Sequence, residues 1–462
     1  MSMIHLIILV LFSIGLIIFL SLLDRQRANV MIFYVLVIIV FIPFKYMLPY
    51  DKSFLVNDIL ILFTFLYYSI KNARIRKKFD RTFSHLLILI ILFGIGLIYS
   101  IFISSNFQSF SSYYYSYYLS IRLLVIYYLY FNLIEDHNYY KRLFLIVNCI
   151  AFTASIYLLY EFLINYNAPS FYLEKSAWDT YHATLSSSWK EGSLLPWLGG
   201  TNGRSKLLLL FFSFILSIRC FTRGTFFRLF RIVNLFFITL AIVIQFSKSA
   251  YVFYFIIILV YLYFSFEIKL KGLVNFSFVF LLTFFFYNAV IENEIAMDRI
   301  DSAMTEKVSS TSRTMLVIDG LDYAKQNYYL GNGFESVRLN KNYLKLHYPK
   351  LGMQNTHNTF LEILIDVGFM GLFVFIIFLK RIVYNSSSLI KWGLNQLRNN
   401  FGLIGYTTVI IFTLSALVGH GLLRSSIPFG PLFIIIIAAV NKLKILPEIT
   451  NNKAHNYSSM RS

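Results

Sequence analysis

The residues best suited to chemistry stand just before an apolar stretch late in the chain, where Gln354 to Glu362 reads QNTHNTFLE. Asn355 or Thr356 is a suitable N-cap, so we expect His357 in the first turn of a helix that starts at a membrane surface. A helix N-terminus carries partial positive charge and free N–H groups, which attract anions and favour the neutral imidazole. His357 could therefore act as a general base; the alternative is a polar interfacial cap without chemistry.

Four cations are predicted on the same side of the membrane as this histidine. Arg313 follows a serine-rich run that can cap a helix, and the turn at Gly331–Gly333 should end that helix. Arg204 follows a glycine-rich stretch at the start of another apolar segment, and Lys248 lies in a very short turn between two more. Arg122 lies just inside the outer end of a span. A charge there costs free energy, so a charged residue at such a position is expected to have a function. Such a set suits a diphosphate, although cations near a membrane surface can also anchor to lipid headgroups.

Metal chemistry is not expected from this sequence. Metal-dependent enzymes that act on lipid-linked sugars need paired acids in an outer loop, and the early outer loops contain no Asp-x-Asp or Glu-x-Asp pattern. His347 and His357 also lack the spacing of a zinc pair. We expect no metal and no other cofactor, so an activated substrate or an ion gradient must drive any reaction.

Membrane-spanning helices must position these residues. The 462 residues are 58% hydrophobic and 14% charged, with mean hydropathy +0.66, whereas soluble proteins average about 45–50% apolar and about 25% charged residues. We therefore expect an all-α polytopic membrane protein with about 12–14 transmembrane helices. Thirteen apolar segments of suitable length are present, at 3–23, 30–48, 54–70, 83–103, 119–134, 143–163, 205–221, 229–246, 250–266, 273–290, 358–379, 401–421 and 428–441.

The net charge of +19 reflects the orientation of these spans. It does not indicate nucleic-acid binding, because no soluble basic domain exists to bind nucleic acid. The segment 71–81 holds six Lys or Arg residues against one Asp, so it should be cytoplasmic. Alternation from that loop places the other basic connections and the C-terminal tail inside, and the uncharged stretch 104–118 outside.

Two connections, at about 164–204 and 291–357, are longer than every cytoplasmic one, and both face outward in this arrangement. Long connections are uncommon unless they are functional. The first contains three tryptophans, and the second has helical spacing of apolar residues from Arg313 to Tyr329, so neither has the composition of a disordered insertion. The predicted organisation is N-terminal helices in 1–163, an outer loop in 164–204, central helices in 205–290, a second outer loop in 291–357, C-terminal helices in 358–445 and a cytoplasmic tail in 446–462.

The second outer loop and the span after it resemble the O-antigen ligase/polymerase family of bacterial membrane glycosyltransferases. The pattern of that family is an Arg-led amphipathic helix, a G-x-G turn, then H-N-x-[FY]-L-E before an apolar span that contains G-x-x-G. The corresponding elements here are Arg313, Gly331–Gly333, His357–Glu362 and Gly368–Gly371.

The resemblance covers roughly residues 195–380, including the glycine-rich segment 200–204. One position departs from the pattern: Lys248 stands where many relatives carry arginine. The charge is kept, but the bidentate fork of an arginine is lost, which puts the role of this residue in doubt.

The resemblance implies a GT-C-like glycosyltransferase of the bacterial inner membrane, with an active site facing the periplasm or the exterior. The donor would be an undecaprenyl-diphosphate-linked oligosaccharide, and the acceptor another lipid-linked repeat. His357 would act as general base on the acceptor hydroxyl, Arg313 would stabilise charge on the departing diphosphate, and transfer would invert the anomeric carbon without metal. Further diphosphate or substrate contacts would come from Arg204, Lys248, Arg122 and Asn358.

The favoured function is polymerisation of repeat units into an O-antigen or capsule, with membrane lipid and a chain-length regulator protein as further partners. A ligase that transfers glycan to lipid A–core, or an oligosaccharyltransferase that transfers it to protein, would use the same fold and motif. A flippase or transporter is a remote alternative. Transporters usually contain inverted repeats and broken helices, and neither is evident in the sequence.

Overall fold

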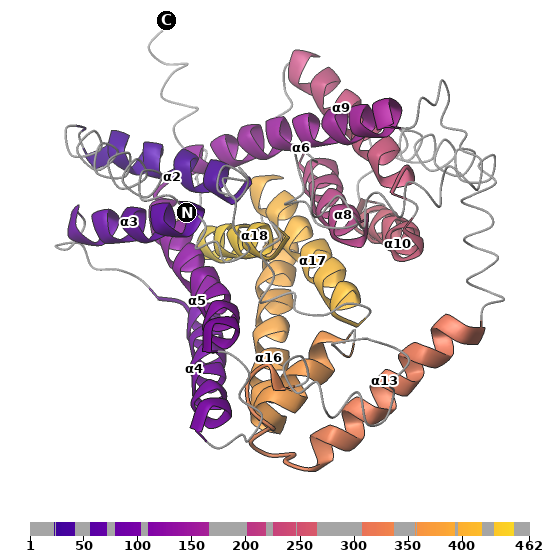
Figure 1. Ribbon diagram of the computed structural model, residues 1–462. Coiled ribbons are helices and arrows are strands. Elements are labelled where there is room, and N and C mark those ends of the chain that lie inside the picture. Colours follow the sequence, from indigo (N-terminus) through magenta and orange to yellow (C-terminus); the bar gives the residue numbers. More distant parts are fainter. Residues whose placement is uncertain are drawn as a thin grey trace, which may run out of the picture.

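The protein is an all-helical polytopic membrane protein (Figure 1). Its computed structural model contains twelve helices and no strand within the residues that it describes. Those residues are 23, 25–41, 56–71, 79–102, 110–165, 201–218, 225–245, 247–265, 307–336, 356, 358–392, 396–417 and 429–447.

Eleven of these helices coincide with predicted apolar segments, and α13 is the helix predicted inside the second outer loop. Nearly all of the predicted span 3–23, and the whole of 273–290, lie outside the described residues. The helices are α2 (Arg25–Phe41), α3 (Val56–Lys71), α4 (Arg81–Phe102), α5 (Phe110–Leu133), α6 (Asn138–Asn165), α8 (Thr201–Ser217), α9 (Thr225–Val243), α10 (Lys248–Ser265), α13 (Lys307–Lys325), α16 (Thr359–Trp392), α17 (Gln396–Leu417) and α18 (Phe429–Ile445).

Five described helices are long and apolar enough to cross a membrane: α4, α6, α9, α16 and α17. Most of the remaining apolar helices are shorter, whereas α5 has 24 residues and is rich in tyrosine and serine. The class of fold is thus confirmed, and the number of thirteen spans stays a prediction.

Two helices extend furthest beyond the segments that the hydropathy pattern predicted. The span expected at 119–134 begins nine residues earlier, at Phe110, because the neutral tyrosine-rich stretch before it continues the helix. The span expected at 358–379 continues to Trp392. The residues added to α16, at 380–392, include basic and polar side chains, but they include no glycine or proline that would end a helix.

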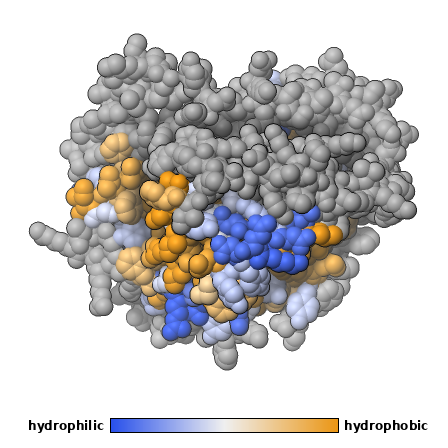
Figure 2. Space-filling view, turned by 60° about the horizontal axis from the view of Figure 1, so that its bottom comes forward, coloured by the Kyte–Doolittle hydropathy of each residue, from blue (hydrophilic) through white to orange (hydrophobic). Residues whose placement is uncertain are grey.

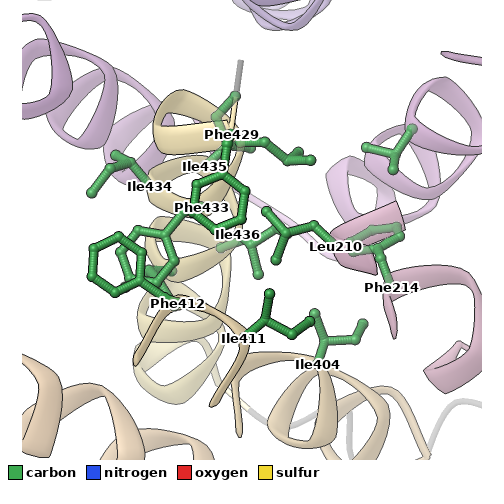
Figure 3. Packing of buried hydrophobic residues seen from close by; sticks show 14 of the residues in the cluster. Leu210, Phe214, Ile404, Ile411, Phe412, Phe429, Phe433, Ile434, Ile435 and Ile436 are labelled. Carbon is green, nitrogen blue, oxygen red and sulfur yellow. The ribbon is translucent and has the colours of Figure 1, made fainter. Parts of the chain in front are cut away.

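The centre of the molecule is formed by α16, α17 and α18. α16 packs against α4, α13 and α17, while α18 packs against α5 and α17. α18 is apolar on all sides and almost wholly buried, as expected for a helix surrounded by others. Figure 3 shows its phenylalanines and isoleucines between α8 and α17, with the rings of Phe412 and Phe433 stacked at 4.1 Å. In a membrane such close packing stabilises the fold mainly through van der Waals contact.

Contacts between helix ends agree with the alternating directions of the chain. The hydroxyl of Tyr140, near the start of α6, donates to the carbonyl of Ala439, near the end of α18, at 3.0 Å. Arg231, near the start of α9, donates to the carbonyls of Ile215 and Leu216 at the end of α8, at 2.9 and 2.7 Å. Each contact joins ends that the charge pattern places on the same side.

Figure 2 brings the bottom of Figure 1 forward. Hydrophobic residues gather on the left, the side where Figure 1 places α4. The exposed apolar residues of α4 recur at helical spacing: Ile88, Ile91, Ile95, Ile98 and Phe102. That face of α4 is therefore suited to contact with lipid.

Candidate active site

The Gly-Asn-Gly turn predicted from the sequence is inserted into the backbone of α16. The amide of Asn332 donates to the carbonyl of Ile365 at 2.6 Å, and the amide of Phe369 donates to the carbonyl of Tyr328 at 2.8 Å. Ile365 and Phe369 are four residues apart, so they would bond to each other in a continuous helix. The turn instead satisfies both groups, and the Asn332 side chain also donates to the carbonyl of Tyr323 at 2.8 Å.

The break in α16 that admits the turn is at Gly368. Its backbone has φ +69° and ψ −169°, a region that is essentially restricted to glycine. A Cβ atom there would also collide with the Tyr329 carbonyl, and one at Gly331 (φ +79°) would lie 2.5 Å from the backbone of Asp366. These two glycines are therefore required for the close approach of α16 and the turn.

The other side of the turn rests on α4. The amide of Phe334 donates to the Gly96 carbonyl at 3.1 Å, and the Ser100 hydroxyl donates to the Phe334 carbonyl at 3.1 Å. Gly333 (φ +99°) lies against Ser100, with no room for a side chain. The Phe334 ring is fully buried and lies 5.3 Å from that of Phe93. The turn thus joins α4 and α16, which are far apart in the sequence.

Two carboxylates that sequence reasoning did not select lie at this junction. Asp366 is 2% exposed, and its Oδ1 accepts a hydrogen bond from the Ser336 amide at 3.2 Å. Glu335 is 5% exposed and has φ +58°, an uncommon conformation for a residue with a side chain. The sequence could have indicated Asp366, because an acidic residue four positions after Glu362 in an apolar span marks a functional or paired group.

The start of α16 differs from the expectation. Asn358 is its N-cap: the amide of Leu361 donates to Asn358 Oδ1 at 3.0 Å, and the helix begins at Thr359. The prediction that Asn355 or Thr356 caps this helix, with His357 in its first turn, is therefore wrong. Thr356 instead supports the cap, since its hydroxyl donates to the Asn358 carbonyl at 3.1 Å. The side-chain oxygen of Asn358 already accepts the hydrogen bond of this cap. The side-chain nitrogen is therefore the group that remains to donate to a substrate.

His357 itself lies outside the described residues, but its two neighbours are described. α13 reaches this point, since a Cβ on Gly320 would be 2.7 Å from the Leu361 side chain and 3.1 Å from that of Thr356. The helix that carries Arg313 is thus packed on Thr356 and Leu361, which lie close to His357 in the sequence. The side chain of Arg313 is not among those described.

α13 also corrects the predicted helix bounds. It begins at Lys307, so the serine-rich run lies inside the helix and Arg313 is its seventh residue. The helix ends at Lys325, and a further turn separates it from Gly331, whose amide donates to the Asn327 carbonyl at 2.8 Å.

Two of the other predicted cations lie at the starts of neighbouring helices. Arg204 is in the first turn of α8 and is 3% exposed. Lys248 is the first residue of α10, although its side chain is not described. α8 and α10 pack together, with the rings of Phe212 and Tyr254 at 4.6 Å. Both helices also pack against α17, which packs against α16.

Arg122 lies farther from the start of its helix than the sequence predicted. Because α5 begins at Phe110, Arg122 is its thirteenth residue, roughly 18 Å along the helix axis from the start. It is 6% exposed. Its helix packs mainly against α18 and α4.

A residue that the sequence analysis missed lies beside Lys248. Gln245 is 1% exposed, and within the described part of the chain neither its Oε1 nor its Nε2 has a hydrogen-bond partner. It occupies the connection between α9 and α10, where the Tyr251 hydroxyl donates to the Val243 carbonyl at 2.8 Å. The available signal was a lone amide at the end of an apolar segment, directly before the Ser-Lys-Ser turn.

The described residues include no group of three His, Cys, Asp or Glu side chains placed to hold a metal ion. The groups that can act here are hydrogen-bond donors and cations near helix starts, which suit an anionic ligand.

Comparison with known proteins places this geometry in a family. Residues 233–376 match the family model described as O-antigen ligase. The matched region runs from α9 into α16 and includes the Gln245–Lys248 connection, α13, the Gly-Asn-Gly turn and the break at Gly368. No curated protein matches the chain. Over residues 233–376, the match supports the assignment to the O-antigen ligase/polymerase family that the motifs of the sequence indicate.

Proposed function

We propose that this protein is a glycosyltransferase of polysaccharide assembly that polymerises undecaprenyl-diphosphate-linked repeat units. The observation that carries this proposal is the family match over 233–376, which contains α13, the turn and the part of α16 that the turn enters. A family role in O-antigen assembly requires a lipid-linked glycan donor. The cations at the starts of α8 and α10 suit the diphosphate of such a donor.

In the proposed reaction, a hydroxyl oxygen of the acceptor sugar attacks the anomeric carbon of the donor. The bond from that carbon to the diphosphate oxygen breaks, and the polyprenyl diphosphate leaves with the bonding electrons. His357 takes the hydroxyl proton, and the attack from the opposite face inverts the anomeric carbon. The diphosphate leaving group already activates the donor, so neither a metal nor a nucleotide is required.

The charge that develops on the diphosphate must be stabilised by cations. We assign this role to Arg313, Arg204 and Lys248, whose helices are linked through α16 and α17. Arg122 is the least suited of the predicted cations, because it lies deeper in α5. The Asn358 amide nitrogen is assigned a hydrogen bond to a substrate oxygen.

Gln245 is assigned to the same donor site. A buried amide with two unpartnered polar atoms is costly unless a ligand completes its hydrogen bonds. Its position three residues before Lys248 places it at the turn where the diphosphate is expected. In this assignment Nε2 donates to a phosphate or sugar oxygen of the donor.

The inserted turn gives the site its rigidity. Because the turn is bonded to both halves of the broken α16 and to α4, it holds α13 at a fixed position relative to the start of α16. The helix that carries Arg313 is thereby held against the described start of α16, which supports catalysis by orientation.

A transporter has one observation in its favour, since broken helices are a feature of transporters and α16 is broken at Gly368. In a transporter the freed backbone groups bind the ion or substrate. Here the turn occupies both the Ile365 carbonyl and the Phe369 amide. The inserted turn therefore holds the two halves of α16 in place. This favours a glycosyltransferase over a transporter.

The test is reconstitution of the purified protein in vesicles with a synthetic lipid-linked repeat unit. A ladder of lengthening products, with release of polyprenyl diphosphate, is expected. If the repeat is transferred only when lipid A–core is supplied, the protein is a ligase. If neither acceptor gives a product but the lipid-linked repeat crosses the bilayer, the transporter is correct.

A further inference from the structure

A second cationic cluster lies at the other end of α16, where α18 also ends. The Lys444 Nζ is 4.4 Å from the centroid of the Tyr384 ring, and the Arg381 guanidinium carbon is 5.3 Å from the same centroid. Two cations on one ring repel each other, and the charge of Arg381 acts unfavourably on Lys444. An anion bound between them would remove this repulsion.

The lysine of this cluster is held in place by a chain of buried amides and hydroxyls. Lys444 donates to Asn385 Oδ1 at 2.9 Å, and Asn385 donates to Asn441 Oδ1 at 2.8 Å. Asn441 donates to the Tyr127 hydroxyl, which donates to Asp80 Oδ1, each at 2.8 Å. The chain joins α16, α18, α5 and the start of α4. A lysine positioned this way is not a freely moving surface charge.

The nearby carboxylate of Asp80 accepts hydrogen bonds from neutral donors. Asp80 accepts hydrogen bonds from the Tyr127 hydroxyl and from the amide of Phe83, at 2.8 and 3.0 Å. Arg381 Nε and His85 Nδ1 are buried atoms without a hydrogen-bond partner in the described ranges. Arg381 Nε is therefore a donor that a bound anion could use.

The surroundings of the cluster are apolar and exposed. Phe79 is 60% exposed, Tyr384 is 59% exposed, and the outward face of α4 continues from there with Ile88 and Ile91. α4 packs along α16, so this apolar face leads away from the cations along both helices. A free phosphate would use only the cations, whereas a phospholipid would use the cations and the apolar face together.

We propose that Arg381 and Lys444 bind the headgroup phosphate of an anionic phospholipid whose acyl chains lie along α4 and α16. By the charge pattern, this end faces the cytoplasmic leaflet, where anionic headgroups bind basic pockets between helices. The lipid connects α4, α16 and α18 on the side opposite the candidate active site. The site is independent of the reaction proposed above.

The test uses the purified full chain in detergent with phosphatidylglycerol, phosphatidylcholine or glycerol 1-phosphate. Native mass spectrometry and thermal denaturation measure binding. Phosphatidylglycerol is expected to bind and to raise the melting temperature, whereas the other two are not. Equal effects of both lipids, or of glycerol 1-phosphate and phosphatidylglycerol, would overturn the proposal without any variant.

Variants then locate the site. The double variant R381Q/K444Q is expected to weaken phosphatidylglycerol binding by about tenfold or more, as for the loss of a hydrogen bond to a charged group. The matched control is K442Q, which removes the same charge two residues away on α18. Lys442 contacts the Phe131 ring at 5.1 Å instead. An equal loss in K442Q would indicate diffuse attraction to the surface and refute a defined site.

Discussion

Replacing Gln245 by methionine separates a ligand-binding role from a structural one. The side chain is 1% exposed, and within the described residues both of its polar atoms lack a partner. An unsatisfied buried polar group costs about 1–3 kcal/mol. Methionine has a similar shape and no such group, so Gln245→Met is expected to stabilise the protein without substrate by about 1–3 kcal/mol. A structural hydrogen-bonding role would instead destabilise it.

The same substitution should impair the use of the donor. A hydrogen bond to a charged group contributes about 1.5–3 kcal/mol, which corresponds to a roughly ten- to hundredfold rise in KM for the lipid-linked donor. Melting temperature and initial rates in reconstituted vesicles measure the two effects on one preparation. A higher melting temperature together with a higher KM is the expected combination.

The matched control is Thr408→Val in α17. Thr408 is fully buried, and its hydroxyl also lacks a partner in the part of the chain described. This variant should match Gln245→Met in the direction of its stability change and leave KM unaltered. A Gln245→Met protein that is less stable than wild type, or that has an unchanged KM, would refute the assignment of Gln245 to the donor site.

The remaining predictions concern the motif residues and the turn. His357→Ala should abolish polymer while the protein remains inserted, and a normal ladder of chain lengths in that variant would disprove the general base. Arg313→Ala should also be inactive, whereas Arg313→Lys should keep part of the activity because the charge remains; wild-type ladders from both variants would contradict a role at the diphosphate. Gly368→Ala should unfold the α16 junction, because the backbone region alone costs about 1–3 kcal/mol and the Cβ also meets the Tyr329 carbonyl. Loss of folded protein on size-exclusion chromatography measures it, with Gly94→Ala as the control, since a Cβ there meets only the movable end of the Tyr117 side chain.

Helix positions were largely predictable from the sequence because the membrane imposes them. A chain that crosses lipid must satisfy its backbone in helices of sufficient apolar length, so apolar runs locate the helices directly. The same reasoning failed at helix ends outside the apolar core. The tyrosine-rich start of α5 and the polar end of α16 are helical without a hydropathy signal, and the first of these errors placed Arg122 too near the start of its helix.

The candidate site was predictable as a set of motifs but not as a geometry. The sequence by itself determined the helical class, the order of Arg313, the Gly-Asn-Gly turn and His357, and the resemblance that the family match confirms. Only the tertiary structure decided that the turn enters α16, because that requires Asn332 and Tyr328 to bond groups near Gly368, about forty residues away. Hydropathy and local propensity carry no information on such pairings. For the same reason only the structure identified Gln245 and the cations around Tyr384, whose surroundings are contributed by several helices.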